Sequence, residues 1–158
     1  MKFALSDLLV TSSTFTDGGP IPRECTGEGA DTSPDLQWKS VPEGTQSIAV
    51  ICHDPDAPVI SSGSYGFVHW VLYNLPASTT QLAGGATDFS SGLNDFGNLG
   101  YGGPMPPEGH GTHRYFFWVI ALSREPNLND GLTLNQLLQE IEADALGMNR
   151  LVGTYQRG

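Results

Sequence analysis

The sequence predicts an all-β protein, and three observations support this prediction. Twenty glycines and eleven prolines among 158 residues mark many turns, as in chains built from short strands. Runs rich in β-branched and aromatic residues predict strands over residues 47–53, 66–75 and 115–122. The strands over 47–53 and 66–75 are apolar on both faces, which is typical of strands inside a two-layer structure.

Length and composition limit the classes of protein that fit. A chain of 158 residues can bury a sizeable core, and we expect residues 1–158 to form a single domain. The apolar content of 39% and the charged content of 15% argue against a disordered chain and against a coiled coil. The net charge of −10 opposes binding to nucleic acid or to an anionic membrane, so a bound anion must be held by local donors.

Two further patterns bear on location and redox state. The N-terminal residues lack the apolar core of about 7–15 residues that a signal peptide carries. The longest apolar run, 115–122, is far shorter than the roughly 20 residues of a membrane span, so we expect a cytoplasmic protein without such a span. For Cys25 and Cys52 we expect two buried free thiols, with a disulfide as the open alternative.

The first half of the chain is predicted to alternate strands with loops. Residues 3–10 form a first strand, the polar residues 21–36 cross the surface as a loop, and residues 36–38 form a short strand. After the strand over 47–53 come a proline-stiffened segment and a Ser/Gly-rich connection to Tyr65. In the strand over 66–75, strict alternation places five side chains on one face: Phe67, His69, Val71, Tyr73 and Leu75.

The second half contains a long irregular stretch and a stiff loop. Residues 76–99 have no clear period, and we expect an excursion with short strands, a feature that is often functional. In the loop that follows, the glycines permit positive φ and the prolines fix φ: Gly102, Gly103, Gly109 and Gly111, then Pro104, Pro106 and Pro107. His113 and Tyr115 share one face where this loop enters the next strand, which predicts a binding site.

One helix is predicted near the C-terminus, over residues 133–146, because its apolar residues follow helical spacing. Thr133 and Gln136 fit a capping box at its start, and Gly147 is placed to end it. Residues 150–155 are predicted to form a final strand.

Four residues far apart in the sequence are candidates for one pocket: Asp54, His69, His113 and Tyr115. Asp54 directly follows a buried strand, and the two histidines belong to different strands. Two simpler interpretations stay open. Asp56 is equally well explained as a turn-forming aspartate, and His69 as a core histidine with satisfied hydrogen bonds.

Catalytic and metal sites fit the sequence less well. Cys52, His53 and Asp54 are the residue types of a nucleophilic triad, but adjacent strand residues point to opposite faces. The chain has no G-x-S-x-G, H-E-x-x-H or C-x-x-C motif. A His/His/Asp metal site is an alternative that the spacing does not favour, and no metal or cofactor is expected.

Three segments, in this order, resemble the phosphatidylethanolamine-binding protein family, which includes Raf kinase inhibitor protein: DPDAP (54–58), HWVLYNLP (69–76) and GYGGPMPPEGHGTHRYFFWVIAL (100–122). The segments TSPDLQW (32–38) and LVGTY (151–155) are similar to the bacterial and archaeal branch of that family. The resemblance covers nearly the whole chain. It implies a β-sandwich of two antiparallel sheets, with one or two short peripheral helices and a small cavity at one end.

The family's cavity binds phosphate-like or carboxylate anions, including a phospholipid head group. Matching motif to motif assigns eight residues of this chain to the cavity: Asp54, Asp56, His69, Met105, Pro106, Pro107, His113 and Tyr115. The resemblance also implies a cis peptide bond before Pro58, and bacterial relatives suggest a homodimer.

The function predicted from these residues is non-catalytic binding of an anion. His69 and His113 would hold it together with the Tyr115 hydroxyl, Asp54 would accept from an imidazole, and Asp56 would mainly hold its loop. Two alternatives stay open. One is a protein-interaction inhibitor of a kinase or protease, and the other is a weak hydrolase that uses a His/Asp pair as general base.

Overall fold

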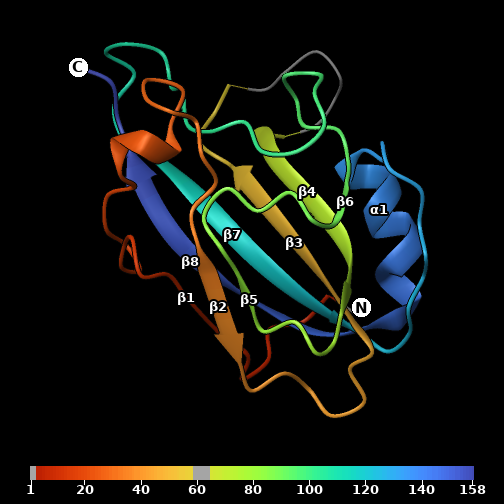
Figure 1. Cartoon of the computed structure of the whole chain (residues 1–158). Coiled ribbons are helices and arrows are strands. Elements are labelled where there is room, and N and C mark those ends of the chain that lie inside the picture. The colour runs from red at the N-terminus through yellow and green to blue at the C-terminus, as the bar shows by residue number, and fades with distance from the viewer. Residues whose placement is uncertain (1–2, 59–64) are drawn as a thin grey trace.

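The computed structural model, which describes residues 3–58 and 65–158, consists of two antiparallel β-sheets (Figure 1). One sheet has the strand order β1-β2-β5 and the other β6-β4-β3-β7-β8. The elements are β1 (Leu9–Thr11), η1 (Arg23–Cys25), β2 (Leu36–Lys39), β3 (Ser47–Asp54), β4 (Phe67–Pro76), β5 (Gln81–Leu82), β6 (Ser90–Ser91), β7 (His113–Leu122), α1 (Leu134–Ile141), η2 (Glu142–Asp144) and β8 (Ala145–Tyr155). The predicted sandwich is confirmed. The connection predicted before Tyr65 falls on residues 59–64, outside the described residues.

The most apolar strand forms the centre of the larger sheet. β3 lies between β4 and β7, and all of its residues except His53 are buried. On its inner face, Val50 belongs to one core cluster with Trp38 of the smaller sheet. On its outer face a second cluster joins Tyr73 of β4 to Leu137 of α1. The five-stranded sheet is therefore covered on both faces, which explains its nearly continuous apolar strands.

A β-bulge interrupts the pairing of β3 with β4. Cys52 pairs with Trp70, and the next residue of β3, His53, pairs with Val68. His69 is therefore an extra residue between two ladder pairs, and such an insertion changes the direction of the side chains around it.

The bulge decides which face His69 occupies. Val71 and Tyr73 pack in the cluster under α1. Strict alternation would place His69 beside them, and that prediction is wrong. The His69 ring instead lies 5.2 Å from the ring of Tyr115, between the ring centroids, on the inner face of the sheet.

The helix is shorter than its apolar spacing predicts. Its capping box is confirmed, because the Thr133 hydroxyl accepts from the Gln136 backbone N–H and the Gln136 side chain accepts from the Thr133 backbone N–H. The predicted end at Gly147 is wrong, since α1 ends at Ile141 and β8 already begins at Ala145. Gly147 allows β8 to pack closely against Ser6, because an added Cβ would lie 2.7 Å from the Cβ of Ser6.

Three local predictions have mixed outcomes. Of the first strand predicted over 3–10, regular pairing covers only β1, and Leu5 makes an isolated bridge with Met148. Cys25 and Cys52 are both buried and free, as expected. The expected cis bond before Pro58 is wrong, because the peptide bonds in the described segments are all trans.

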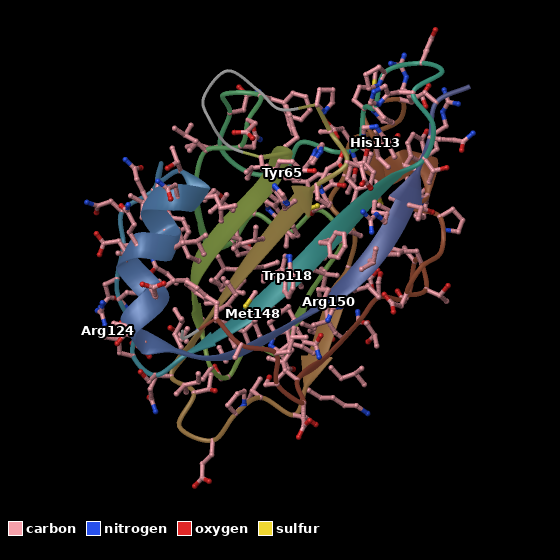
Figure 2. The ribbon with its side chains drawn as sticks, turned by 180° about the vertical axis from the view of Figure 1, so that it is seen from behind. Tyr65, His113, Trp118, Arg124, Met148 and Arg150 are labelled. Atoms are coloured by element: carbon pink, nitrogen blue, oxygen red, sulfur yellow. The ribbon has the colours of Figure 1, made fainter. Side chains whose placement is uncertain are left out.

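Figure 2 shows the outer face of the five-stranded sheet, of which α1 covers one side. Beside the helix-covered part, the guanidinium of Arg150 lies 5.5 Å from the centre of the Trp118 ring. In residues 3–58 and 65–158, no helix is long and apolar enough to cross a membrane.

Candidate functional site

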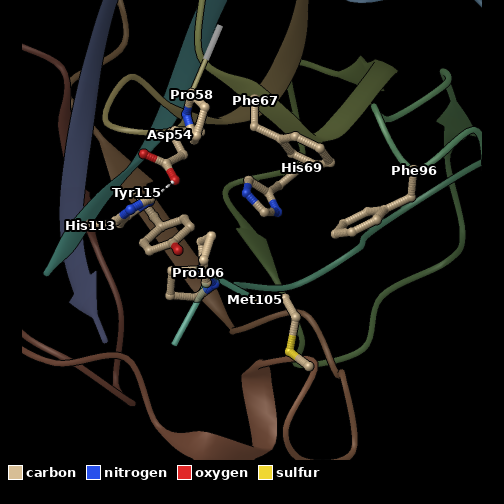
Figure 3. Close-up of a pocket in the computed structure, with 11 residues that line it drawn as sticks. Asp54, Pro58, Phe67, His69, Phe96, Met105, Pro106, His113 and Tyr115 are labelled. Carbon is tan, nitrogen blue, oxygen red and sulfur yellow. Dashed lines mark hydrogen bonds and ion pairs between the residues drawn. The ribbon is translucent and has the colours of Figure 1, made fainter. Parts of the chain in front are cut away.

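A pocket of about 190 Å³ brings together side chains from three strands and two loops (Figure 3). β3 contributes Asp54, β4 contributes His69, and β7 contributes His113 and Tyr115. The loop before β7 (residues 100–112, the rim loop) contributes Met105, Pro106 and Pro107, which the family motif assigned to the cavity. The structure thus places every predicted site residue at this pocket except Asp56.

Asp54 and His113 form a buried hydrogen-bonded pair in the pocket wall. Each is 2% exposed, and His113 Nδ1 lies 2.7 Å from Asp54 Oδ2. Since a carboxylate can only accept, Nδ1 carries the proton. The second carboxylate oxygen accepts from the backbone N–H of Asp56 at 2.8 Å. These contacts fix the tautomer and the orientation of the His113 ring.

His110 extends this pair to the protein surface. Its Nδ1 lies 2.7 Å from His113 Nε2, and its own side chain is exposed. One proton lies between these two nitrogens, so Asp54, His113 and His110 form a hydrogen-bonded chain from the interior to solvent. Sequence reasoning missed His110. The feature that could have identified His110 is its position three residues before His113, between Gly109 and Gly111, which both have positive φ.

His69 is held in place by a backbone carbonyl. Its Nδ1 lies 2.6 Å from the Gly102 carbonyl oxygen, and the residue is 3% exposed. Burial lowers its pKa to about 4, because the interior disfavours the charged imidazolium more than the nearby carbonyl favours it. His69 is therefore a neutral imidazole at physiological pH.

Tyr115 supplies a hydroxyl to the pocket. The residue is fully buried, and its ring packs edge-on against His69. Burial raises the pKa of the Tyr115 hydroxyl, so it stays protonated at neutral pH. Within the described part of the chain this hydroxyl has no hydrogen-bond partner, which leaves it able to donate to a group in the pocket.

Asp56 lies outside the pocket and faces Arg114. Its Oδ1 accepts from Arg114 Nη2 at 2.8 Å, and its Oδ2 accepts from both the backbone N–H and the Nε of Arg114 at 2.9 Å. These hydrogen bonds hold the pKa of Asp56 below its ordinary value. Asp56 therefore ties its loop to β7 and donates its own N–H to Asp54. The pocket assignment made from its motif is corrected accordingly.

The glycines of the rim loop serve two different purposes. Gly109 and Gly111 adopt the positive φ that glycine permits. Gly102 and Gly103 do not use this freedom, because neither has positive φ. They allow close approach instead: an added Cβ at Gly102 would lie 2.5 Å from the ring of Phe96, and one at Gly103 would meet the carbonyl oxygen of Cys25.

Sequence reasoning also missed the apolar wall of the pocket. Four further residues line it: Ala57, Pro58, Phe67 and Phe96. The Phe67 and Phe96 rings lie 4.7 Å apart in an edge-on arrangement, and both pack against His69. Phe96 belongs to the irregular stretch 76–99, where no sequence period indicates that a side chain turns toward the site.

The C-terminal residues hold the rim loop. The guanidinium of Arg157 donates to the Pro106 carbonyl oxygen and to Glu108 Oε1, each at 3.3 Å, and lies 3.5 Å from Glu28 Oε2. Thr112 donates to the side-chain oxygen of Gln156 at 2.6 Å. The end of the chain thus fixes both sides of the loop that carries the pocket rim.

The arrangement of potential ligand side chains gives no support for a metal site. Within residues 3–58 and 65–158, no group of three or more His, Cys, Asp or Glu side chains is arranged to hold an ion. The groups of the pocket that can contact a ligand are hydrogen-bonding side chains and aromatic rings.

Comparison with known proteins gives a consistent result. A model of the family described as phosphatidylethanolamine-binding protein matches residues 11–156. A UPF0098 protein of Aquifex aeolicus is 41% identical over 155 residues, covering 94% of this chain and 88% of that protein. A UPF0098 protein of Methanothermobacter thermautotrophicus is 42% identical over 151 residues, covering 91% of this chain and 95% of that protein. The crystal structure of E. coli YbcL, described as a new member of the mammalian PEBP family, matches with a TM-score of 0.88 and 33% identity, over 97% of this chain and 100% of that one.

Proposed function

The chain belongs to the phosphatidylethanolamine-binding protein family, and from this premise we propose that its pocket binds a small phosphate or carboxylate group. The observation that carries the proposal is the convergence of Asp54, His113 and Tyr115 on one pocket. Its volume of about 190 Å³ is below the roughly 300–1,000 Å³ of pockets for drug-sized ligands, so a head group of a few heavy atoms fits best.

The donors of the pocket suit an acidic group. The Tyr115 hydroxyl is protonated and open to the pocket, and the His113 ring forms part of the wall beside it. An acidic group in the pocket can therefore accept a hydrogen bond from Tyr115.

The apolar wall supports a ligand that carries hydrocarbon next to its acidic group. Phe67, Phe96 and Met105 all line the pocket, and Phe96 and Met105 lie toward its mouth, where they are 48% and 41% exposed. Such a surface can pack against the alkyl part of a phosphate ester while its acidic end lies between the histidines. A phosphorylated head group fits this arrangement better than a bare ion.

We propose binding without turnover. Both ring nitrogens of His113 are engaged, one by Asp54 and one by His110. The described residues that line the pocket include no serine, threonine or cysteine that an imidazole could activate. A phosphate monoester incubated with the protein should therefore be recovered unchanged.

The test is a calorimetric titration with inorganic phosphate and with phosphoethanolamine, for the natural protein and for His113→Ala. Removing the His113 ring leaves the Asp54 carboxylate unpaired beside the bound anion, so the affinity of both ligands should weaken at least about tenfold. Arg124→Ala is a matched control, because Arg124 pairs with Asp144 away from the pocket. Equal affinities for the natural protein and His113→Ala would overturn the proposal.

A further inference from the structure

One ring nitrogen of His69 is hydrogen-bonded to the protein backbone. Nδ1 faces the carbonyl oxygen of Gly102, and a carbonyl can only accept, so Nδ1 carries the proton. Figure 3 shows the His69 ring turned with its other nitrogen toward the space between Asp54 and Tyr115. Among the described residues, Nε2 has no hydrogen-bond partner. In neutral His69 this atom presents a lone pair to the pocket.

The surroundings of His69 keep the ring neutral. The residue is 3% exposed, and burial lowers its pKa to about 4. Two carboxylates act against this shift, but burial outweighs them. The titratable groups around the ring are Asp54 and His53 of β3, Tyr115 and His113 of β7, and Asp95 of the loop after β6.

We propose that His69 makes the pocket select an acidic group that still carries a proton, and reject a fully deprotonated anion of the same size. The O–H of a hydrogen phosphate or of a phosphate monoester monoanion would donate to His69 Nε2, while another of its oxygens accepts from the Tyr115 hydroxyl. A bare oxyanion would place its lone pairs against that of Nε2. This inference rests on the proposed function, because it requires that the pocket takes an acidic group at all.

The charges near the pocket also favour a ligand that carries a proton. The described lining residues include the carboxylate of Asp54 and no lysine or arginine. The chain as a whole has a net charge of −10. A proton on the ligand removes one negative charge from a site with little positive charge to offset it, so the monoanion is favoured over the dianion.

Inorganic phosphate and sulfate are the discriminating probes, because they have the same shape. Near neutral pH phosphate carries at least one proton and sulfate carries none. We expect calorimetry on the natural protein to give a Kd for phosphate at least about tenfold below that for sulfate. Sulfate affinity should rise as the pH falls toward 4, where His69 gains its second proton and Nε2 becomes a donor.

Two variants separate His69 from the rest of the pocket. In His69→Gln the amide can present either its oxygen or its NH₂ group, so the two affinities should come within about threefold of each other. Tyr115→Phe removes a donor that both anions use, so both should weaken and their ratio should stay as in the natural protein.

The outcomes distinguish this inference from the proposed function. If phosphate and sulfate bind the natural protein equally, or if the ratio is unchanged in His69→Gln, selection by His69 is overturned while anion binding stands. If neither anion binds, the proposed function fails and the inference fails with it. The pH dependence of sulfate binding needs no variant, so the test holds even if His69→Gln does not fold.

Discussion

His113 Nδ1 lies 2.7 Å from Asp54 Oδ2, in a contact that joins residues 59 positions apart. Both side chains are buried, so removing one partner leaves the other unpaired in the interior, where it cannot be solvated. We predict that Asp54→Ala lowers the free energy of unfolding by about 3 kcal/mol, measured by urea denaturation.

The control for this prediction is an exposed ion pair nearby. Arg114 Nη2 lies 2.8 Å from Asp56 Oδ1, and the Arg114 side chain is 55% exposed. Because solvent screens this pair, Arg114→Ala should change the unfolding free energy far less than Asp54→Ala. Equal losses in the two variants would show that burial of the Asp54–His113 pair does not determine its contribution.

His69 should make the fold sensitive to mild acid. Its pKa is about 4 in the folded protein, below the ordinary value of 6.5, so the unfolded chain binds its proton first as the pH falls. The contribution of neutral His69 to the free energy of unfolding is therefore complete above pH 6.5 and is lost as the pH falls toward 4. The loss over this window is about 3 kcal/mol.

The measurement is urea unfolding of the natural protein and of His69→Gln at several pH values between 7 and 4. Glutamine does not titrate. The unfolding free energy of the natural protein should therefore fall by about 3 kcal/mol relative to that of His69→Gln across this range. A difference that stays constant with pH would mean that His69 is not held neutral by burial.

Most of the fold could be predicted because its main strands carry local signals. The strand over 47–53 is apolar at nearly every position, and β3 occupies this range plus one residue. His113 and Tyr115 lie on one face because alternation is unbroken along β7, which pairs regularly with β3 from Ser47 to His53. The same regularity explains why Asp54 faces the pocket: it lies two residues beyond Cys52, which is also on the inner face.

The parts that could not be predicted depend on pairing between segments. The face of His69 is set by a bulge against Cys52 and His53, and no residue of β4 alone indicates where the ladder slips. The end of α1 is set by β8, which takes Gly147 into the sheet for its close contact with Ser6. Such contacts override the helical spacing of the apolar residues.

Two adjacent glycines of the rim loop should respond differently to substitution. A Cβ at Gly103 would meet the backbone carbonyl of Cys25, which cannot move without displacing η1. We predict that Gly103→Ala lowers the free energy of unfolding by about 2 kcal/mol. At Gly102 the added Cβ meets the ring of Phe96, which is 48% exposed and can turn aside.

Gly102→Ala should therefore cost much less stability than Gly103→Ala, but it should change the pocket wall. Chemical denaturation measures the first effect, and the NMR chemical shifts of the Phe67 and His69 rings report the second, since both pack against Phe96. A larger stability loss for Gly102→Ala than for Gly103→Ala would contradict the packing described for this loop.

Arg157 should control the order of the pocket rim more than the stability of the fold. Its guanidinium donates to the Pro106 carbonyl and to Glu108 and pairs with Glu28, and Arg157→Ala removes these contacts while leaving the sheets intact. We predict that amide hydrogens of residues 108–112 then exchange at least about threefold faster, because the loop opens more often. Arg124→Ala, which breaks an ion pair with Asp144 instead, should leave these amides unchanged. Unchanged exchange in Arg157→Ala would mean that the prolines and glycines of the loop hold the rim without the C-terminal residues.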